Sequence, residues 1–123
     1  MGRGLSELQK AILMATADET NAERWRSSSD VCSKNYARLR NLPEPPPTPL
    51  ALEHYRTSRH VIYDNFYDGE MGNSQVVSVC RAIKRLKDRG LVQDTNRWRR
   101  EFVLPTPEGL AKGRELMAKE PLP

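Results

Sequence analysis

The sequence contains few of the residues from which protein cores are built. Leucine, isoleucine, valine and phenylalanine number 25 among 123 residues, close to the fraction below which chains stop burying a core. No apolar run approaches the ~20 residues of a membrane-spanning helix. Arg3, Glu7 and Lys10 interrupt the segment where a signal peptide needs its apolar centre. Two cysteines make no disulfide framework. These features predict one small, soluble domain in the cytoplasm.

Patterns typical of catalysis and metal binding are also missing. His54 and His60 do not have the spacing of a zinc motif, and the two cysteines are remote from them in sequence. The segment 64–69 faintly resembles a calcium loop, but Gln75 stands where the twelfth position needs an acid. No phosphate-binding glycine loop and no nucleophile elbow occur. We therefore expect no enzyme activity, no cofactor, no metal and no small-molecule substrate.

The charge is unevenly distributed. The net charge is +4, yet residues 74–104 hold eight Lys and Arg against three Asp and Glu, so the rest of the chain is close to neutral. Clustered basic residues are typical of proteins that bind a polyanion. The alternative is a solvated helix face that only keeps the protein soluble.

The two ends of the chain predict helices. In residues 5–17, Ser6 and Gln9 have the spacing of a capping box, followed by apolar residues at helical intervals. In residues 107–119, Thr106 is an expected N-cap and Pro107 suits the first helical position.

The middle of the chain is less regular. Residues 18–50 read as a polar, proline-rich insertion with a short helix over about 30–40. Five of the seven residues 43–49 are proline, which favours a stiff connector over a ligand for an SH3 domain. Residues 50–68 predict one helix, or two that are interrupted near Ser58, before turn signals at Asp68-Gly69 and Gly72-Asn73.

Residues 74–89 give the clearest helical pattern, with Ser74 as N-cap and Gly90 as the glycine that ends the helix. One side carries the apolar positions Val76, Val79, Cys80, Ile83 and Leu86, and the other side carries Gln75, Ser78, Arg81, Ala82, Arg85 and Arg89. Two short strands follow, 91–92 and 102–104, joined by a loop that carries Arg97, Trp98, Arg99 and Arg100.

This order of elements predicts a mainly α fold with a small β-hairpin. A helix pair followed by a hairpin suggests a helix-turn-helix with a wing, whose second helix enters the DNA major groove. We expect residues 1–123 to form one winged-helix domain that carries the insertion at about 18–50.

The segment Arg81 to Val92 (RAIKRLKDRGLV) resembles the recognition-helix end and first wing strand of winged helix-turn-helix regulators of the multiple-antibiotic-resistance type. Phe102 to Gly109 (FVLPTPEG) is similar to the second wing strand and the start of the next helix, with Pro105 as an extra residue. The resemblance covers about residues 60–117. It implies that Arg81 and Arg85 contact bases or phosphates.

Other residues join these two as candidate contacts. Gln75 and Ser78 lie near the start of the same face, and the wing arginines suit the backbone or the minor groove. Trp98 is expected to pack on the hairpin, and Lys84, Lys87 and Arg89 are not assigned as contacts. The candidate DNA-binding residues are Ser74, Gln75, Ser78, Arg81, Arg85, Arg97, Arg99 and Arg100.

The sequence thus predicts a small transcriptional regulator that binds double-stranded DNA, dimeric through its terminal helices. One alternative is a winged helix that binds protein within a replication or transcription assembly, because this fold serves both purposes. Another is a binder of double-stranded RNA or Z-form nucleic acid. No membrane association is expected.

Overall fold

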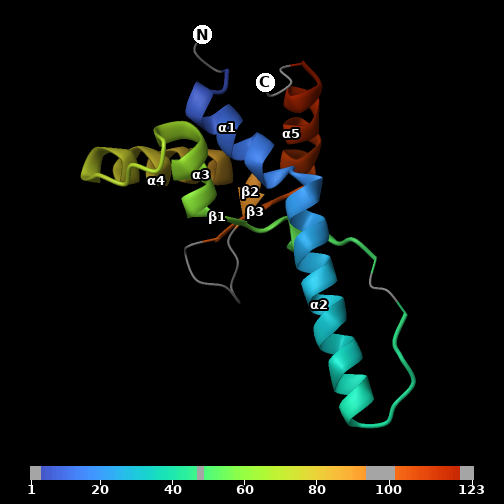
Figure 1. Ribbon diagram of the computed structural model, residues 1–123. Coiled ribbons are helices and arrows are strands. Elements are labelled where there is room, and N and C mark those ends of the chain that lie inside the picture. The colour runs from blue at the N-terminus through green and yellow to red at the C-terminus, as the bar shows by residue number, and fades with distance from the viewer. Residues whose placement is uncertain (1–3, 47–48, 94–101, 120–123) are drawn as a thin grey trace.

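The computed structural model describes residues 4–46, 49–93 and 102–119, which form a mainly helical chain with a small antiparallel sheet (Figure 1). The expectation of an α-rich fold with few strands is confirmed. In chain order the elements are α1 (Glu7–Thr16), α2 (Glu19–Leu39), the 3-10 helix η1 (Leu52–Tyr55), β1 (Thr57–Ser58), α3 (Arg59–Tyr67), α4 (Asn73–Asp88), β2 (Val92–Gln93), β3 (Phe102–Pro105) and α5 (Pro107–Lys119).

The sheet has three strands in the order β1-β3-β2, and both pairs are antiparallel. Thr57 pairs with Val103, and Val92 pairs with Pro105. The two strands expected after α4 are therefore confirmed; the first is shifted by one residue and the second ends one residue later. No sequence pattern predicts β1, because a strand of two residues is too short to show alternation.

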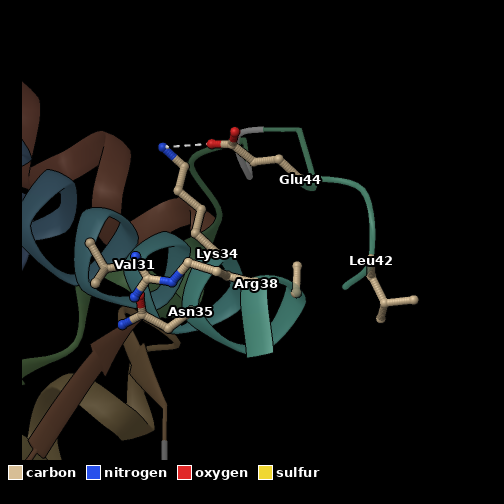
Figure 2. Close-up of a pocket in the computed structure, with 7 residues that line it drawn as sticks. Val31, Lys34, Asn35, Arg38, Leu42 and Glu44 are labelled. Atoms are coloured by element: carbon tan, nitrogen blue, oxygen red, sulfur yellow. Dashed lines mark hydrogen bonds and ion pairs between the residues drawn. The ribbon is translucent and has the colours of Figure 1, made fainter. Parts of the chain in front are cut away.

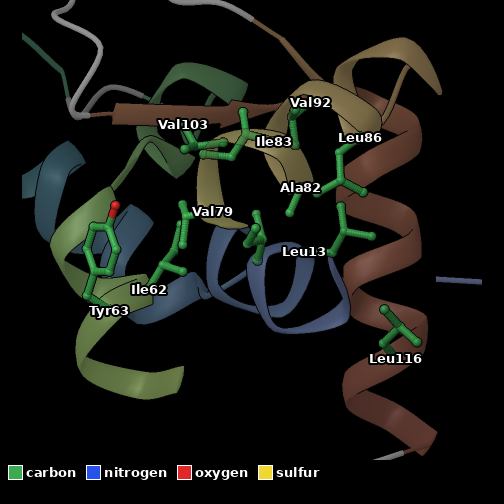
Figure 3. Close-up of a cluster of buried hydrophobic side chains, with 11 residues drawn as sticks. Leu13, Ile62, Tyr63, Val79, Ala82, Ile83, Leu86, Val92, Val103 and Leu116 are labelled. Carbon is green, nitrogen blue, oxygen red and sulfur yellow. The ribbon is translucent and has the colours of Figure 1, made fainter. Parts of the chain in front are cut away.

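The hydrophobic core lies where α1, α3, α4 and α5 meet the sheet (Figure 3). Ile12 and Leu13 of α1 and Leu86 of α4 are fully buried. Each such side chain stabilises the fold by ~1.5–3 kcal/mol relative to leaving it in water. The few apolar residues are thus concentrated in one place, which is how so polar a chain still builds a core.

Both terminal helices start as the sequence predicts. The backbone N–H of Gln9 donates to Ser6 Oγ at 3.2 Å, and the N–H of Ser6 donates to Gln9 Oε1 at 2.9 Å, which completes the capping box. At α5, the N–H of Gly109 donates to Thr106 Oγ1 at 3.0 Å. These bonds satisfy N–H groups that a helix start leaves without a partner.

α1 and α5 pack closely against each other. A side chain at Gly113 would meet the carbonyl oxygen of Leu13 and the Cβ of Ala17, so only glycine lets the two helices approach this far. Leu116 adds its side chain to the same contact with the core. The helices expected to form a homodimer surface thus already use their apolar faces within the chain.

Residues 19–39 form one continuous helix, α2, which corrects the expectation of an irregular region with a short helix over about 30–40. Asp18 caps it, because its Oδ1 accepts from the N–H of Thr20 at 2.9 Å. Arg26 lies 2.7 Å from Glu23 and 3.2 Å from Asp30. Side-chain pairs of this spacing add ~0.2–0.5 kcal/mol each to a helix. They help a helix form where apolar periodicity does not predict one.

The first half of α2 is attached to the sheet through Trp25. The Trp25 ring meets Phe102 edge-on, with centroids 5.8 Å apart, and the Arg56 guanidinium lies 3.9 Å above the ring. Asn21 Nδ2 donates to the backbone oxygen of Arg56 at 2.9 Å. Beyond this attachment α2 extends away from the other elements (Figure 1).

After α2 the chain turns and runs back beside it. The N–H of Leu42 donates to the backbone oxygen of Ala37 at 2.8 Å. Lys34 Nζ lies 3.3 Å from Glu44 Oε1, across a hollow between the helix and the returning chain (Figure 2). Residues 43–46 have no regular secondary structure, as the prolines predict; residues 47–48 lie outside the described part of the chain.

Candidate nucleic-acid interface

Helix α4 has one face in the core and one in solvent. Val79, Ala82, Ile83 and Leu86 are buried. The outward side is exposed along the whole helix. The predicted division of residues 74–89 is confirmed for Val79, Ile83 and Leu86. It is wrong at two positions: Ala82, predicted on the polar side, is buried, and Cys80, predicted on the apolar side, is exposed.

The start of α4 differs from the prediction. Its N-cap is Gly72, not Ser74, and no side chain caps it. The turn before it uses Asp68 and Gly69 with positive φ angles of 52° and 85°, a backbone conformation that Asp tolerates and Gly adopts freely. Ser74 is thereby placed inside the first turn of the helix.

Gln75 is only half exposed, and its amide is engaged. Ser74 Oγ donates to Gln75 Oε1 at 3.2 Å, and Gln75 Nε2 donates to Glu70 Oε2 at 3.5 Å. Both bonds are on the surface. They hold Gln75 toward the preceding turn and use one of the two N–H donors of its amide.

Four residues follow one another along the outermost line of α4: Ser74, Val77, Arg81 and Lys84. They are three or four positions apart, which places them on one side of a helix, and all four are exposed. Within the described residues, neither Arg81 nor Lys84 has an ion pair. This line, the outer line of α4, carries uncharged groups at its start and positive charge further on, and the exposed Asp88, four positions beyond Lys84, adds one negative charge at the end of the helix.

Two of these residues, Val77 and Lys84, are not among the DNA contacts that the sequence analysis assigns. Val77 lies outside the apolar stripe of the core and is 46% exposed. Lys84 belongs to the same line as Arg81, although the sequence pattern does not assign it as a contact. Their helical spacing from Ser74 and Arg81 is the sequence signal that could have placed both residues on this line.

Ser78 and Arg85 lie on the flank of α4 rather than on its outer line. Arg85 borders a shallow hollow beside the start of α1, together with Ser6, Gln9 and Arg89. Eleven positions separate it from Ser74, or about 16 Å along a helix that rises 1.5 Å per residue. The structure therefore does not bring Arg85 together with Ser74 and Gln75.

Arg59 is a further basic residue near α4. It is the first residue of α3, after the N-cap Ser58, whose Oγ accepts from the N–H of His60 at 3.2 Å. Arg59 Nη1 donates to Cys80 Sγ at 3.3 Å, which brings the start of α3 beside the exposed side of α4. The helix break at Ser58 is visible in the sequence; the contact with Cys80 is not.

The predicted wing arginines, Arg97, Arg99 and Arg100, and Trp98 lie outside the described residues. The strands on either side of them are described: β2 ends at Gln93 and β3 begins at Phe102. Gln93 pairs with Leu104, and Gln93 Nε2 donates to the backbone oxygen of Pro105 at 3.0 Å. The loop thus starts and ends on paired strands.

Neither a metal-binding cluster nor a helix long and apolar enough to cross a membrane occurs within residues 4–46, 49–93 and 102–119. Comparison of the chain with models of protein families, with curated proteins and with solved structures finds no match. The geometry of α4 and its neighbours is therefore the basis on which a function can be argued.

Proposed function

We propose that this chain is a winged-helix protein that binds double-stranded DNA in a sequence-specific way, as a small transcriptional regulator. The outer line of α4 carries this proposal, because it is an exposed, partly basic helix face of the kind that enters a major groove. The order α1, β1, α3, α4, β2, β3, with sheet order β1-β3-β2, supports it. In this arrangement α3 and α4 are the helix pair, and α2 is an insertion.

The start of α4 would read the bases. In helix-turn-helix proteins the N-terminal residues of the second helix contact base edges. Ser74 and Ser78 offer hydroxyl groups there, and Gln75 offers the second N–H and the oxygen of its amide. Arg81 is one turn further and can donate two hydrogen bonds to a guanine, a contact worth ~1–3 kcal/mol of discrimination.

Basic residues around α4 would bind the backbone. Lys84 lies beside Arg81 on the outer line, and Arg59 stands at the start of α3, the helix that crosses the backbone in this motif. The arginines at 97, 99 and 100 would follow the backbone or enter the minor groove. Such phosphate contacts position the protein and supply most of its affinity.

The alternative function is a winged-helix module that binds protein within a replication or transcription assembly. One observation favours it: the outer half of α2 exposes large apolar side chains, among them Tyr36 and Leu39. This observation concerns a surface other than α4, so the alternative is tested separately from DNA binding.

The first experiment is fluorescence anisotropy with a random-sequence duplex at several salt concentrations. We expect the logarithm of the affinity to fall steeply with the logarithm of the salt concentration, because bound phosphates release counterions. Arg81→Ala should weaken binding about tenfold, which corresponds to about 1.4 kcal/mol. Arg85→Ala should weaken it less, because Arg85 lies on the flank beside α1.

Lys112→Ala is the matched control, since it removes one positive charge from α5, where Lys112 pairs with Glu115 at 3.6 Å. It should bind like the wild type. A folded protein that does not bind duplex at low salt would contradict the proposal and favour the protein-binding alternative.

A further inference from the structure

Val77 is an apolar side chain on the exposed face of α4. It is 46% exposed, and on the outer line of α4 it stands between Ser74 and Arg81. Val79, two residues further along the helix, is fully buried in the core (Figure 3). Because each residue of a helix turns the direction of the side chain by about 100°, Val77 points away from the core. It is no part of the hydrophobic cluster that holds the fold together.

Neither packing nor helix formation accounts for a valine at this position. Valine favours a helix less than alanine, lysine or glutamate do, and a side chain turned to solvent gains little from burial. Single exposed apolar residues are common on protein surfaces. This one is set apart by its neighbours on the same line, the hydroxyl of Ser74 on one side and the cations Arg81 and Lys84 on the other. It thus lies within the surface that we propose to enter the major groove.

The major groove offers one kind of apolar group to such a side chain. All four bases present hydrogen-bond donors or acceptors there, but only thymine adds a C5-methyl group. A valine pressed against the polar edge of another base would remove that edge from water without giving it a partner, which is unfavourable. Against the thymine methyl, both surfaces are apolar and their burial is favourable. An apolar residue at this place therefore selects thymine among the four bases.

We propose that Val77 contacts the C5-methyl group of a thymine and so makes the chain prefer a T·A pair at one position of its DNA site. This inference rests on the proposed function, because it needs α4 in the major groove. Val77 is the fifth residue of α4. It therefore belongs to the N-terminal part of the helix, which contacts base edges in helix-turn-helix proteins.

The spacing between Val77 and Arg81 relates this thymine to a guanine. Arg81 stands four residues after Val77 on the same line, which is about 6 Å along the helix axis. Neighbouring base pairs are ~3.4 Å apart, so the two side chains reach base pairs about two steps apart. We therefore expect a preferred site in which a thymine lies about two base pairs from a guanine, on the same strand or on the opposite one.

Selection of duplexes from a random pool by the wild-type chain gives the preferred site. Each thymine of that site is then replaced in turn by deoxyuridine, which keeps every hydrogen-bonding group of the base and removes only the methyl group. Competition measured by fluorescence anisotropy gives the affinity for each duplex. We expect one of these replacements to weaken wild-type binding about fourfold, the effect of burying one methyl group less.

Val77→Ser assigns the effect to this side chain. Serine offers only a short hydroxyl group, which bonds any of the bases, so this variant should bind the thymine duplex and its deoxyuridine form equally well. The fold should be unaffected, because the side chain is exposed. The matched control is Val31→Ser, the same substitution at an exposed position of α2. It should keep the fourfold difference of the wild type.

The proposal is overturned if no thymine of the preferred site responds to deoxyuridine in the wild type. It is also overturned if Val77→Ser keeps the difference, or if Val31→Ser loses it as well. A chain that binds duplexes with a steep salt dependence but is indifferent to the methyl group would refute this inference and leave DNA binding in place. A folded chain that binds no duplex at low salt would contradict both.

Discussion

α2 and α4 are the two longest helices described, and they use their apolar residues in opposite ways. α4 buries Val79, Ile83 and Leu86 against the core, so the side it exposes to solvent is largely polar and basic. α2 buries only Ala22 and Ala37 and leaves an apolar stripe exposed. A helix that its own chain covers offers partners its polar side, and a helix that projects can offer its apolar side. The molecule thus presents two surfaces of different chemistry.

The largest expected difference between these helices is the loss of unfolding free energy when a leucine is replaced by alanine. Leu86 of α4 is fully buried, so Leu86→Ala should destabilise the fold by ~2–5 kcal/mol through lost burial and the cavity left behind. Leu39 of α2 is almost fully exposed, so Leu39→Ala should stay within ~0.5 kcal/mol of the wild type. Urea denaturation followed by circular dichroism measures both.

These measurements need a protein concentration at which the chain is monomeric, so that any association through α2 does not add to stability. Similar costs for the two substitutions would show that the outer half of α2 is packed in solution, contrary to the comparison.

A second difference lies within α2, between its attached and projecting halves. Trp25→Ala removes the contacts with Phe102 and Arg56 and should cost about 2 kcal/mol, from lost burial and the cation–π interaction. Tyr36→Ala removes only a contact with Arg40, whose guanidinium lies 5.3 Å from the ring centroid, and should cost less than about 0.5 kcal/mol. Thermal unfolding of the two variants, at concentrations where the chain is monomeric, measures both losses of stability. Equal losses would contradict the division of α2 into an attached and a projecting half.

Much of the fold could be predicted from the sequence where local signals agree with the core. Ser6 and Thr106 cap helices as their spacing predicts, and Gly90 takes the positive φ of 74° expected after α4. The middle of the chain could not be predicted in this way. Polar pairs such as Glu23–Arg26 help stabilise α2, and the pairing of Thr57 with Val103 defines β1, across 46 positions of sequence.

The candidate site could be predicted in part. Arg81 lies on the outward side of α4, as the alternation of apolar and polar residues predicts. Arg85 shares that polar side in sequence, yet tertiary packing places it beside α1. The approach of Arg59 to Cys80 joins residues 21 positions apart, and no local pattern contains it.

The smallest expected difference in stability concerns the starts of the two helices. Asp18 caps α2 through its 2.9 Å bond with the N–H of Thr20, so Asp18→Ala should cost about 1 kcal/mol, the usual effect of losing a cap. Ser74 follows the N-cap Gly72 of α4 and bonds only a neighbouring side chain. Ser74→Ala should therefore leave the free energy of unfolding within ~0.5 kcal/mol of the wild type, because alanine also favours the helix.

Urea denaturation of both variants and of the wild type measures these free energies of unfolding. Binding of the Ser74→Ala variant to duplex DNA then tests whether Ser74 contacts DNA. If Ser74 faces the bases, Ser74→Ala alters the affinity for a preferred DNA sequence while the stability stays the same. A stability loss as large as that of Asp18→Ala would instead show that Ser74 caps α4 in solution. The helix would then begin later than Asn73, and its first turn would no longer present Ser74 to a groove.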